Sequence, residues 1–358
     1  MRKLLICIMA ILLIMGLMLT SGCKKEESME GIEIIGAGAT FPYPLYVKMF
    51  EEYNKLTVVK VNYQGIGSGG GIKQITAKTV DFGASDAFLS DEELENIKRE
   101  TNGGEIVHIP ICLGSVVLTY NLKDVTSLNL TPDLIANIFL GKIKKWNDPA
   151  IVAENPDVKL PNLNISVVHR SDGSGTTFVF TDYLTKANKE WAAKVGVGKS
   201  VDWPVGLGGK GNPGVQGLVT QVEGSIGYVE LIYAIENKMP VASVKNKSGK
   251  YITPSLESTT LSAQIDIPAD TRVSITDTDA GDGYPISSFT WILVYKEQNY
   301  DNRTKSQAKA LVKLLKWMVN EGQVIPPTLG YASLLDSAKE KANKLISSMT
   351  YGGKVILK

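Results

Sequence analysis

The sequence predicts an α/β fold of two domains, on two observations. From Gly31 onward, short segments rich in β-branched residues alternate with amphipathic helical segments, which is the pattern of a sheet covered by helices. The chain of 358 residues also exceeds the usual size of one domain, so two domains are expected.

The first third of the chain supplies these strands and helices in turn. Behind Pro44, the residues Leu45, Met49, Phe50 and Tyr53 fall on one helical face, which predicts a helix. The elements expected next are a strand over 59–63, a helix over 71–77, a strand over 80–85, a charged helix opened by a capping box at 90–93, and a long apolar crossing over 106–122.

The rest of the chain repeats the pattern. Thr131 followed by proline predicts the start of a helix that Gly141 ends. The stretch 203–217 is rich in glycine and contains Gly-Asn-Pro-Gly, so it is expected to be a loop. The other elements expected are strands over 165–169, 225–230 and 290–295, a helix that begins near residue 174, and a late helix over 308–318.

The N-terminus is similar to a bacterial lipoprotein signal. Arg2 and Lys3 precede an uncharged run over 4–19, and small residues lead up to Cys23. Residues 1–22 are therefore expected to be a signal peptide, with cleavage before Cys23 and a lipid on its sulfur. Residues 23–30 then form a polar tether. The alternative is an uncleaved membrane anchor, and either places the remainder outside the cytoplasm.

Cysteine, histidine and charge exclude several classes of function. Cys112 lies alone in an apolar run, so a buried free thiol is expected rather than a disulfide framework. With only two histidines besides it, no zinc spacing exists, and neither a metal nor a cofactor is expected. Without the signal peptide, the 38 basic residues fall to 36 against 37 acidic ones. Such a chain has no basic field for nucleic acid.

The segment 170–177, Arg-Ser-Asp-Gly-Ser-Gly-Thr-Thr, has the chemistry to hold a small oxyanion. A helix that begins near Ser174 directs its unpaired N–H groups and the positive end of its dipole at the loop. Ser174 and Thr176 add hydroxyls, and Arg170 adds a guanidinium. The alternative for this segment is a serine cap on a turn that binds nothing.

Two more loops share this design. Residues 36–42 and 65–71 are rich in small residues that let backbone N–H groups approach a ligand, and they carry the hydroxyls of Thr40 and Ser68. In open α/β sheets such loops gather at the carboxyl edge of the strands. Three loops of one kind therefore predict a single anion site.

Asp86 is the unexpected partner, because a carboxylate repels an anion. Its presence is explained if the ligand carries its own proton, since Asp86 then accepts a hydrogen bond from a P–OH group. Fully ionised sulfate offers no such proton, so this residue is expected to separate the two anions. The alternative is a helix cap or a surface ion pair.

Five segments in order resemble the phosphate-binding subunits of phosphate ABC importers, and the similarity extends from Ile34 to about Tyr351. The segments are GAGATFP, YQGIGSGGG, VDFGASDA, RSDGSGTTF and SIGYVE. The resemblance implies an extracytoplasmic, lipid-anchored and monomeric protein that binds inorganic phosphate and delivers it to a membrane ABC permease. It also implies a two-lobed periplasmic-binding-protein fold of the class II type, in which each lobe is a mixed sheet flanked by helices.

The resemblance further implies lobe bounds and a ligand set. Lobe one takes 31–113 and 286–358, lobe two takes 114–285, and the crossings near Gly114 and Pro285 form the hinge of a cleft that holds the ligand. Asp172 is expected to hold Arg170 in place. Gly69 departs from many relatives, which have a second serine there, at a position that is not a usual ligand. The implied phosphate ligands are Ala39, Thr40, Phe41, Ser68, Asp86, Arg170, Ser174, Gly175 and Thr176.

Two other functions remain open on the residues alone. Gly65, Gly67 and Gly70 satisfy a dinucleotide-binding pattern, with an acidic residue about twenty positions on. An exported phosphate-ester hydrolase is the second, with Ser174 or Ser68 paired with His169 or His108. Neither serine lies in a Gly-x-Ser-x-Gly elbow. The chain is therefore expected to be a binding protein rather than an enzyme.

Overall fold

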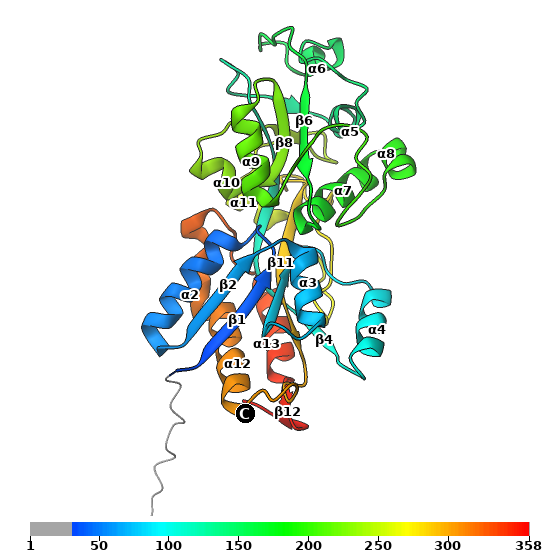
Figure 1. Ribbon diagram of the computed structural model, residues 1–358. Helices are drawn as coiled ribbons and strands as arrows, with labels where there is room; N and C mark the ends of the chain where they lie inside the picture. Colours follow the sequence, from blue (N-terminus) through cyan, green and yellow to red (C-terminus); the bar gives the residue numbers. More distant parts are fainter. Residues whose placement is uncertain (1–30, 358) are drawn as a thin grey trace, which may run out of the picture.

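A computed structural model describes residues 31–357, and it confirms the α/β class. The predicted signal peptide and the whole predicted tether over 23–30, with Cys23, lie outside these residues. One eight-stranded sheet runs in the order β2-β1-β3-β11-β4-β8-β6-β7 (Figure 1). Its strands are β1 (Glu33–Gly38), β2 (Lys60–Gly65), β3 (Phe82–Ser85), β4 (Ile106–Tyr120), β6 (Ser166–Arg170), β7 (Leu207–Gly209), β8 (Ser225–Glu230) and β11 (Ser287–Tyr295).

Helices cover this sheet, and two small sheets complete the fold. The α-helices are α2 (Tyr43–Thr57), α3 (Ser68–Thr76), α4 (Asp91–Glu100), α5 (Pro132–Phe139), α6 (Pro149–Glu154), α7 (Gly175–Ala187), α8 (Lys189–Lys194), α9 (Gly211–Gln221), α10 (Leu231–Glu236), α11 (Leu256–Ser262), α12 (Lys305–Val319) and α13 (Asp336–Ser347). Two 3₁₀ turns are η2 (Glu321–Val324) and η3 (Pro326–Leu329). The small sheets contain β5 (Asn129–Leu130), β9 (Ser243–Lys245) and β10 (Tyr251–Ile252), and β12 (Thr350–Tyr351) and β13 (Lys354–Val355).

β4 joins two halves of the large sheet. Its first part pairs antiparallel with β11 as far as Ser115, and from Val116 it pairs antiparallel with β8. We call β1, β2, β3 and β11 the first half-sheet, and β6, β7 and β8 the second half-sheet. All fifteen residues of β4 are buried, as expected for the apolar crossing. Gly114 lies where the strand changes partner and Pro285 lies just before β11, so both stand at the junction of the halves.

The strand directions place the functional loops. β1 is parallel to β2 and β3, and β6 is parallel to β7 and β8. The loops that leave the carboxyl ends of each set therefore gather at one edge, as the sequence predicts. The two edges face each other in the middle of the molecule (Figure 1).

The prediction of a loop over 203–217 is wrong. This stretch contains β7 and the first turns of α9, whose apolar residues Val215 and Val219 are buried. Pro213 falls in the first turn of α9, where its missing N–H has no intrahelical partner to lose. Gly211 enters the helix with a φ of +69°, a conformation that glycine adopts without strain. Gly211 and Pro213 thus lie in the first turn of a helix and do not prevent it from forming.

Other predicted elements are present, one of them with shifted bounds. The helix predicted over 71–77 begins three residues earlier, at Ser68, so this residue stands in its first turn. The predicted capping box of α4 is present, with Ser90 and Glu93 each bonded to the backbone of the other. Cys112 is fully buried and free. Over 31–357, no helix has the length and apolarity to cross a bilayer, and no cluster of acidic, histidine or cysteine side chains is arranged to hold a metal ion.

Candidate anion-binding site

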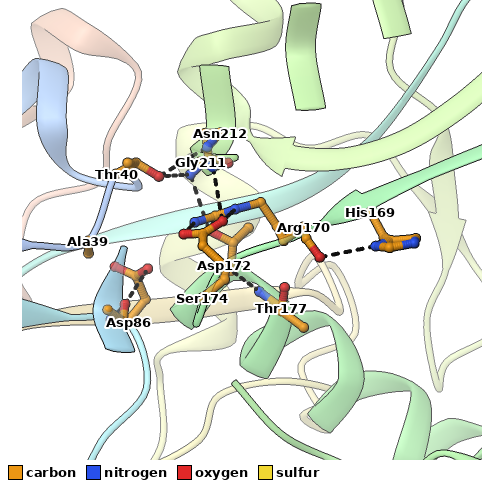
Figure 2. Close-up of polar contacts among 12 residues, drawn as sticks. Ala39, Thr40, Asp86, His169, Arg170, Asp172, Ser174, Thr177, Gly211 and Asn212 are labelled. Carbon is orange, nitrogen blue, oxygen red and sulfur yellow. Dashed lines mark hydrogen bonds and ion pairs between the residues drawn. The ribbon is translucent and has the colours of Figure 1, made fainter. Parts of the chain in front are cut away.

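The structure brings the predicted site residues together between the two half-sheets (Figure 2). The first half-sheet supplies residues 39–41 after β1, Ser68 at the start of α3 and Asp86 directly after β3. The second half-sheet supplies Arg170 at the end of β6 and residues 174–176 at the start of α7. The polar members of this set are all buried: Thr40, Ser68, Asp86, Arg170, Ser174 and Thr176.

Arg170 is held in a fixed orientation. Its Nε and Nη2 donate to the two carboxylate oxygens of Asp172 at 2.8 and 2.5 Å, and Nη1 donates to Thr176 Oγ1 at 3.2 Å. Its backbone N–H donates to the Tyr228 hydroxyl at 3.1 Å. Burial alone would raise the pKa of Asp172, but the hydrogen bonds and charge of Arg170 and the N–H of Gly211 lower it below its usual value. The contact expected between Asp172 and Arg170 is therefore present and ionised.

The start of α7 offers backbone donors. Ser174 caps this helix, and its Oγ accepts the N–H of Thr177 at 3.0 Å. The N–H groups of Gly175 and Thr176 have no acceptor within the helix, because the first turn leaves them free of intrahelical bonds. A Cβ built on Gly175 would lie 2.5 Å from Asp86 Oδ2 and 2.5 Å from Ser68 Oγ. The positive end of α7 therefore faces Asp86 and Ser68 at close range.

Asp86 is buried without a fully compensating cation. Thr290 Oγ1 donates to its Oδ1 at 2.8 Å, and Ser68 Oγ lies 3.5 Å from its Oδ2. Burial raises the pKa of Asp86 to about 7, although the Thr290 hydrogen bond and the charge of Arg170 oppose the rise. The residue thus changes charge near neutral pH, next to the helix terminus.

This shift predicts a pH-dependent effect of Asp86→Asn on the ligand-free protein. A carboxyl whose pKa is raised by folding favours the folded state most below its unfolded pKa, and that contribution is lost as the pH rises through about 7. The amide does not titrate. The variant is therefore expected to gain stability over the wild type between about pH 4 and pH 8, by at most roughly 4 kcal/mol. Thermal unfolding of both proteins across this range tests it.

The matched control is Asp279→Asn, which changes an exposed carboxyl on a distant loop. Its difference in melting temperature from the wild type is expected to stay flat over the same pH range. Parallel profiles for the wild type and Asp86→Asn would contradict the raised pKa.

Sequence reasoning missed two residues that complete the site. Asn212, in the first turn of α9, donates through its side chain to Thr40 and Thr176. Thr290, in the middle of β11, holds Asp86. Asn212 lies in the stretch assigned to a loop, and only its Gly-Asn-Pro-Gly setting marked it. The sequence feature that could have indicated Thr290 is a single hydroxyl in an otherwise apolar part of β11.

The structure gives the two histidines other contacts. His169 stacks on Trp203 with ring centroids 4.8 Å apart, and its Nδ1 lies 3.0 Å from the Arg170 carbonyl oxygen. His108 accepts the Leu89 N–H at 3.0 Å, and burial lowers its pKa to about 3. Within 31–357, neither histidine hydrogen-bonds to a serine of the site. The geometry therefore supplies no serine–histidine pair for hydrolysis.

The glycine-rich segment that leads into α3 and forms its first turn packs on the opposite half. A Cβ on Gly67 would lie 2.3 Å from Asp172 Oδ2, and one on Gly69 would lie 3.1 Å from Gly173 Cα. The Gly69 N–H donates to the Gly173 carbonyl at 2.8 Å. The Gly69 N–H belongs to the first turn of α3, where a dinucleotide pyrophosphate would need free donors, and it is already bonded, which disfavours the dinucleotide alternative.

Comparison with known proteins gives one consistent result. Residues 25–321 match the model of a PBP superfamily domain. The phosphate-binding protein PstS of Xylella fastidiosa is 44% identical over 315 residues, which are 87% of this chain and 84% of that protein. The protein of the same name from Methanocaldococcus jannaschii is 37% identical over 349 residues, 90% of this chain and 89% of its own length.

Solved structures show the same fold at lower identity. A high affinity periplasmic phosphate-binding protein, solved with phosphate, superposes with a TM-score of 0.73 at 22% identity, over 90% of this chain and 97% of the other. A human phosphate binding apolipoprotein superposes with a TM-score of 0.70 at 19% identity, over 90% and 99% of the two chains.

Proposed function

Because the chain belongs to the PBP superfamily and, within it, to the PstS phosphate-binding proteins, we propose that it binds inorganic phosphate outside the cytoplasm and delivers it to an ABC permease. The observation that carries this proposal is the set of buried donors around one buried carboxylate. Ser68 and the first turn of α7 lie against Asp86. Arg170 bonds to Thr176 in that turn, and Asn212 joins Thr176 to Thr40 of the other half.

The donors suit a small tetrahedral anion. Burying an anion costs many kcal/mol unless its oxygens find donors. The guanidinium of Arg170 has five N–H groups, of which three are used by Asp172 and Thr176, so two remain for a ligand. The hydroxyls of Thr40, Ser68 and Thr176 and the free N–H groups of α7 add further donors.

Asp86 supplies the discrimination between anions. Phosphate carries a proton at neutral pH, and an ionised Asp86 accepts a hydrogen bond from it. Sulfate has no proton to donate, so it would set its negative oxygen against the carboxylate. The raised pKa of Asp86, about 7, means that discrimination weakens as the pH falls and the carboxyl becomes protonated.

The two half-sheets correspond, in this proposal, to lobes that close over the ligand. Lobe one takes 31–113 and 286–358 and lobe two takes 114–285, with the crossings at Gly114 and Pro285 as the hinge. Phosphate bridges residues of both lobes and thereby favours the closed state. The ion pair between Lys199 and Glu93, 2.5 Å from Nζ to Oε1, also joins the two sides.

The N-terminal assignments belong to the same proposal. Residues 1–22 are removed as a signal peptide, Cys23 carries the lipid, and the tether holds a monomeric binding protein at the membrane near its permease. Mass spectrometry of the protein from its host tests this directly, because lipidated Cys23 would be the new N-terminal residue.

The test of function is a titration of the protein without residues 1–22 with phosphate and sulfate at pH 8. Phosphate is expected to bind at micromolar concentration or tighter, roughly 8 kcal/mol or more in free energy. Sulfate is expected to bind negligibly. Calorimetry gives both affinities. Tryptophan emission reports closure, since Trp291 packs on Phe88, whose ring contacts Phe178 of α7 in the other half.

The matched variant is Asp86→Asn, whose amide both donates and accepts. It is expected to bind sulfate measurably and so to lower the ratio of the two affinities. Equal affinity of the wild type for both anions would refute the role of Asp86, and a wild type that binds no phosphate would refute the function.

A further inference from the structure

Asn212 lies between the two half-sheets and is fully buried. Its Oδ1 accepts the backbone N–H of Glu230 at 2.9 Å. A backbone N–H can only donate, so this contact fixes the orientation of the side-chain amide. The other terminal atom is therefore Nδ2, which has two hydrogens to donate.

Both hydrogens point to threonine hydroxyls, one from each half. Nδ2 lies 2.9 Å from Thr40 Oγ1 and 3.2 Å from Thr176 Oγ1. Thr40 Oγ1 also accepts the Asn212 backbone N–H at 3.1 Å. Thr176 Oγ1 also accepts from Arg170 Nη1 at 3.2 Å.

These contacts use the acceptor capacity of both hydroxyls. A threonine hydroxyl has two lone pairs and one hydrogen. In Thr40 and in Thr176, both lone pairs face amide or guanidinium N–H groups, which cannot accept in return. The single hydrogen of each hydroxyl is therefore left free to donate to another acceptor.

We propose that Asn212 sets the hydrogen-bond polarity of the site by forcing the hydroxyls of Thr40 and Thr176 to donate to the bound anion. This inference rests on the proposed function and adds a positioning residue to it. Without Asn212 each hydroxyl regains a free lone pair and can turn it toward the anion, which is repulsive. With Asn212 in place, the two hydroxyls donate to the anion, and Asp86 is the group that accepts a hydrogen bond from it.

The arrangement also links polarity to closure. Thr40 belongs to the first half-sheet, whereas Asn212 and Thr176 belong to the second. The two hydrogen bonds from Asn212 to Thr40 Oγ1 therefore form only when the two halves meet. The hydroxyl of Thr40 is thus fixed as a donor in the closed state and is free to rotate in an open one.

The test is a double-mutant cycle on phosphate affinity. Asn212→Ala in the otherwise wild-type chain is expected to weaken phosphate binding by about tenfold or more, from lost hydrogen bonds. In a Thr40→Val/Thr176→Val background the same change is expected to weaken binding by less than about threefold, because no hydroxyl remains to be oriented. Asn212→Asp keeps the shape of the side chain and serves as a second variant. Its carboxylate has no hydrogen to donate and accepts from the two hydroxyls instead, so it is expected to weaken phosphate binding more than Asn212→Ala does in the otherwise wild-type chain.

Asn155→Ala is the control for a purely structural loss. This buried asparagine also makes three hydrogen bonds, to Asn129 and Ile151, away from the site. It is expected to lower the melting temperature and leave phosphate affinity unchanged. Equal losses for Asn212→Ala in both backgrounds, or no loss in either, would overturn the inference while the proposed function stands. A wild type that fails to bind phosphate would overturn both.

Discussion

Arg170→Ala is expected to weaken phosphate binding by roughly 1.5 to 3 kcal/mol or more, which is about tenfold to 150-fold in affinity. The change removes the guanidinium that faces the site and leaves Asp172 without its bidentate partner. An unpaired carboxylate beside the anion adds repulsion to the lost hydrogen bonds. Calorimetry with phosphate measures the effect, and Arg170→Lys is expected to recover little of it, because an ammonium cannot reproduce the bidentate contact.

The matched control is Arg303→Ala. Arg303 is also buried and also pairs with an aspartate, Asp81. Asp81 directly precedes β3, so this pair lies at the end of the strand opposite to Asp86 and the anion site. Its loss is expected to lower the melting temperature and leave phosphate affinity intact. An affinity within about threefold of the wild type for Arg170→Ala would show that the segment 170–177 has been misinterpreted.

Local signals explain which parts of the fold and site were predictable. The caps of α4 and α7 depend on residues three positions apart, so Ser90 and Ser174 were found from the sequence. The three loops of the anion site could be predicted because the carboxyl ends of parallel strands lie at the same edge of a sheet. Both kinds of inference need only the order of residues along the chain.

Contacts between residues far apart in the sequence could not be predicted, for the opposite reason. Asn212 contacts Thr40 across 172 positions, and Thr290 contacts Asp86 across 204. No local pattern fixes such a pair, because the first depends on how the two half-sheets meet and the second on the pairing of β11 with β3. The Gly-Asn-Pro-Gly stretch also depends on a contact that is distant in the sequence. The Gly211 N–H donates to Asp172 at the point where α9 begins.

Gly175→Ala is expected to abolish tight phosphate binding without unfolding the protein. The added Cβ would lie 2.5 Å from Asp86 Oδ2 and Ser68 Oγ, and 2.7 Å from Asp86 Cβ. Asp86 cannot retreat easily, because Thr290 holds its other oxygen. Overpacking of this kind costs about 1 to 3 kcal/mol. The cost falls on the closed state alone, since the contact joins residues of the two halves.

The measurement pairs calorimetry with thermal unfolding of the ligand-free protein. Affinity is expected to fall by about fivefold to 150-fold. The ligand-free variant is expected to stay folded, because the two halves can separate and relieve the clash. Gly217→Ala is the control, because a Cβ at this helical position in α9 meets no atom within 4 Å. Unchanged affinity in Gly175→Ala would mean that phosphate binds without bringing α7 against Asp86, and the closing of the two halves around the anion would have to be abandoned.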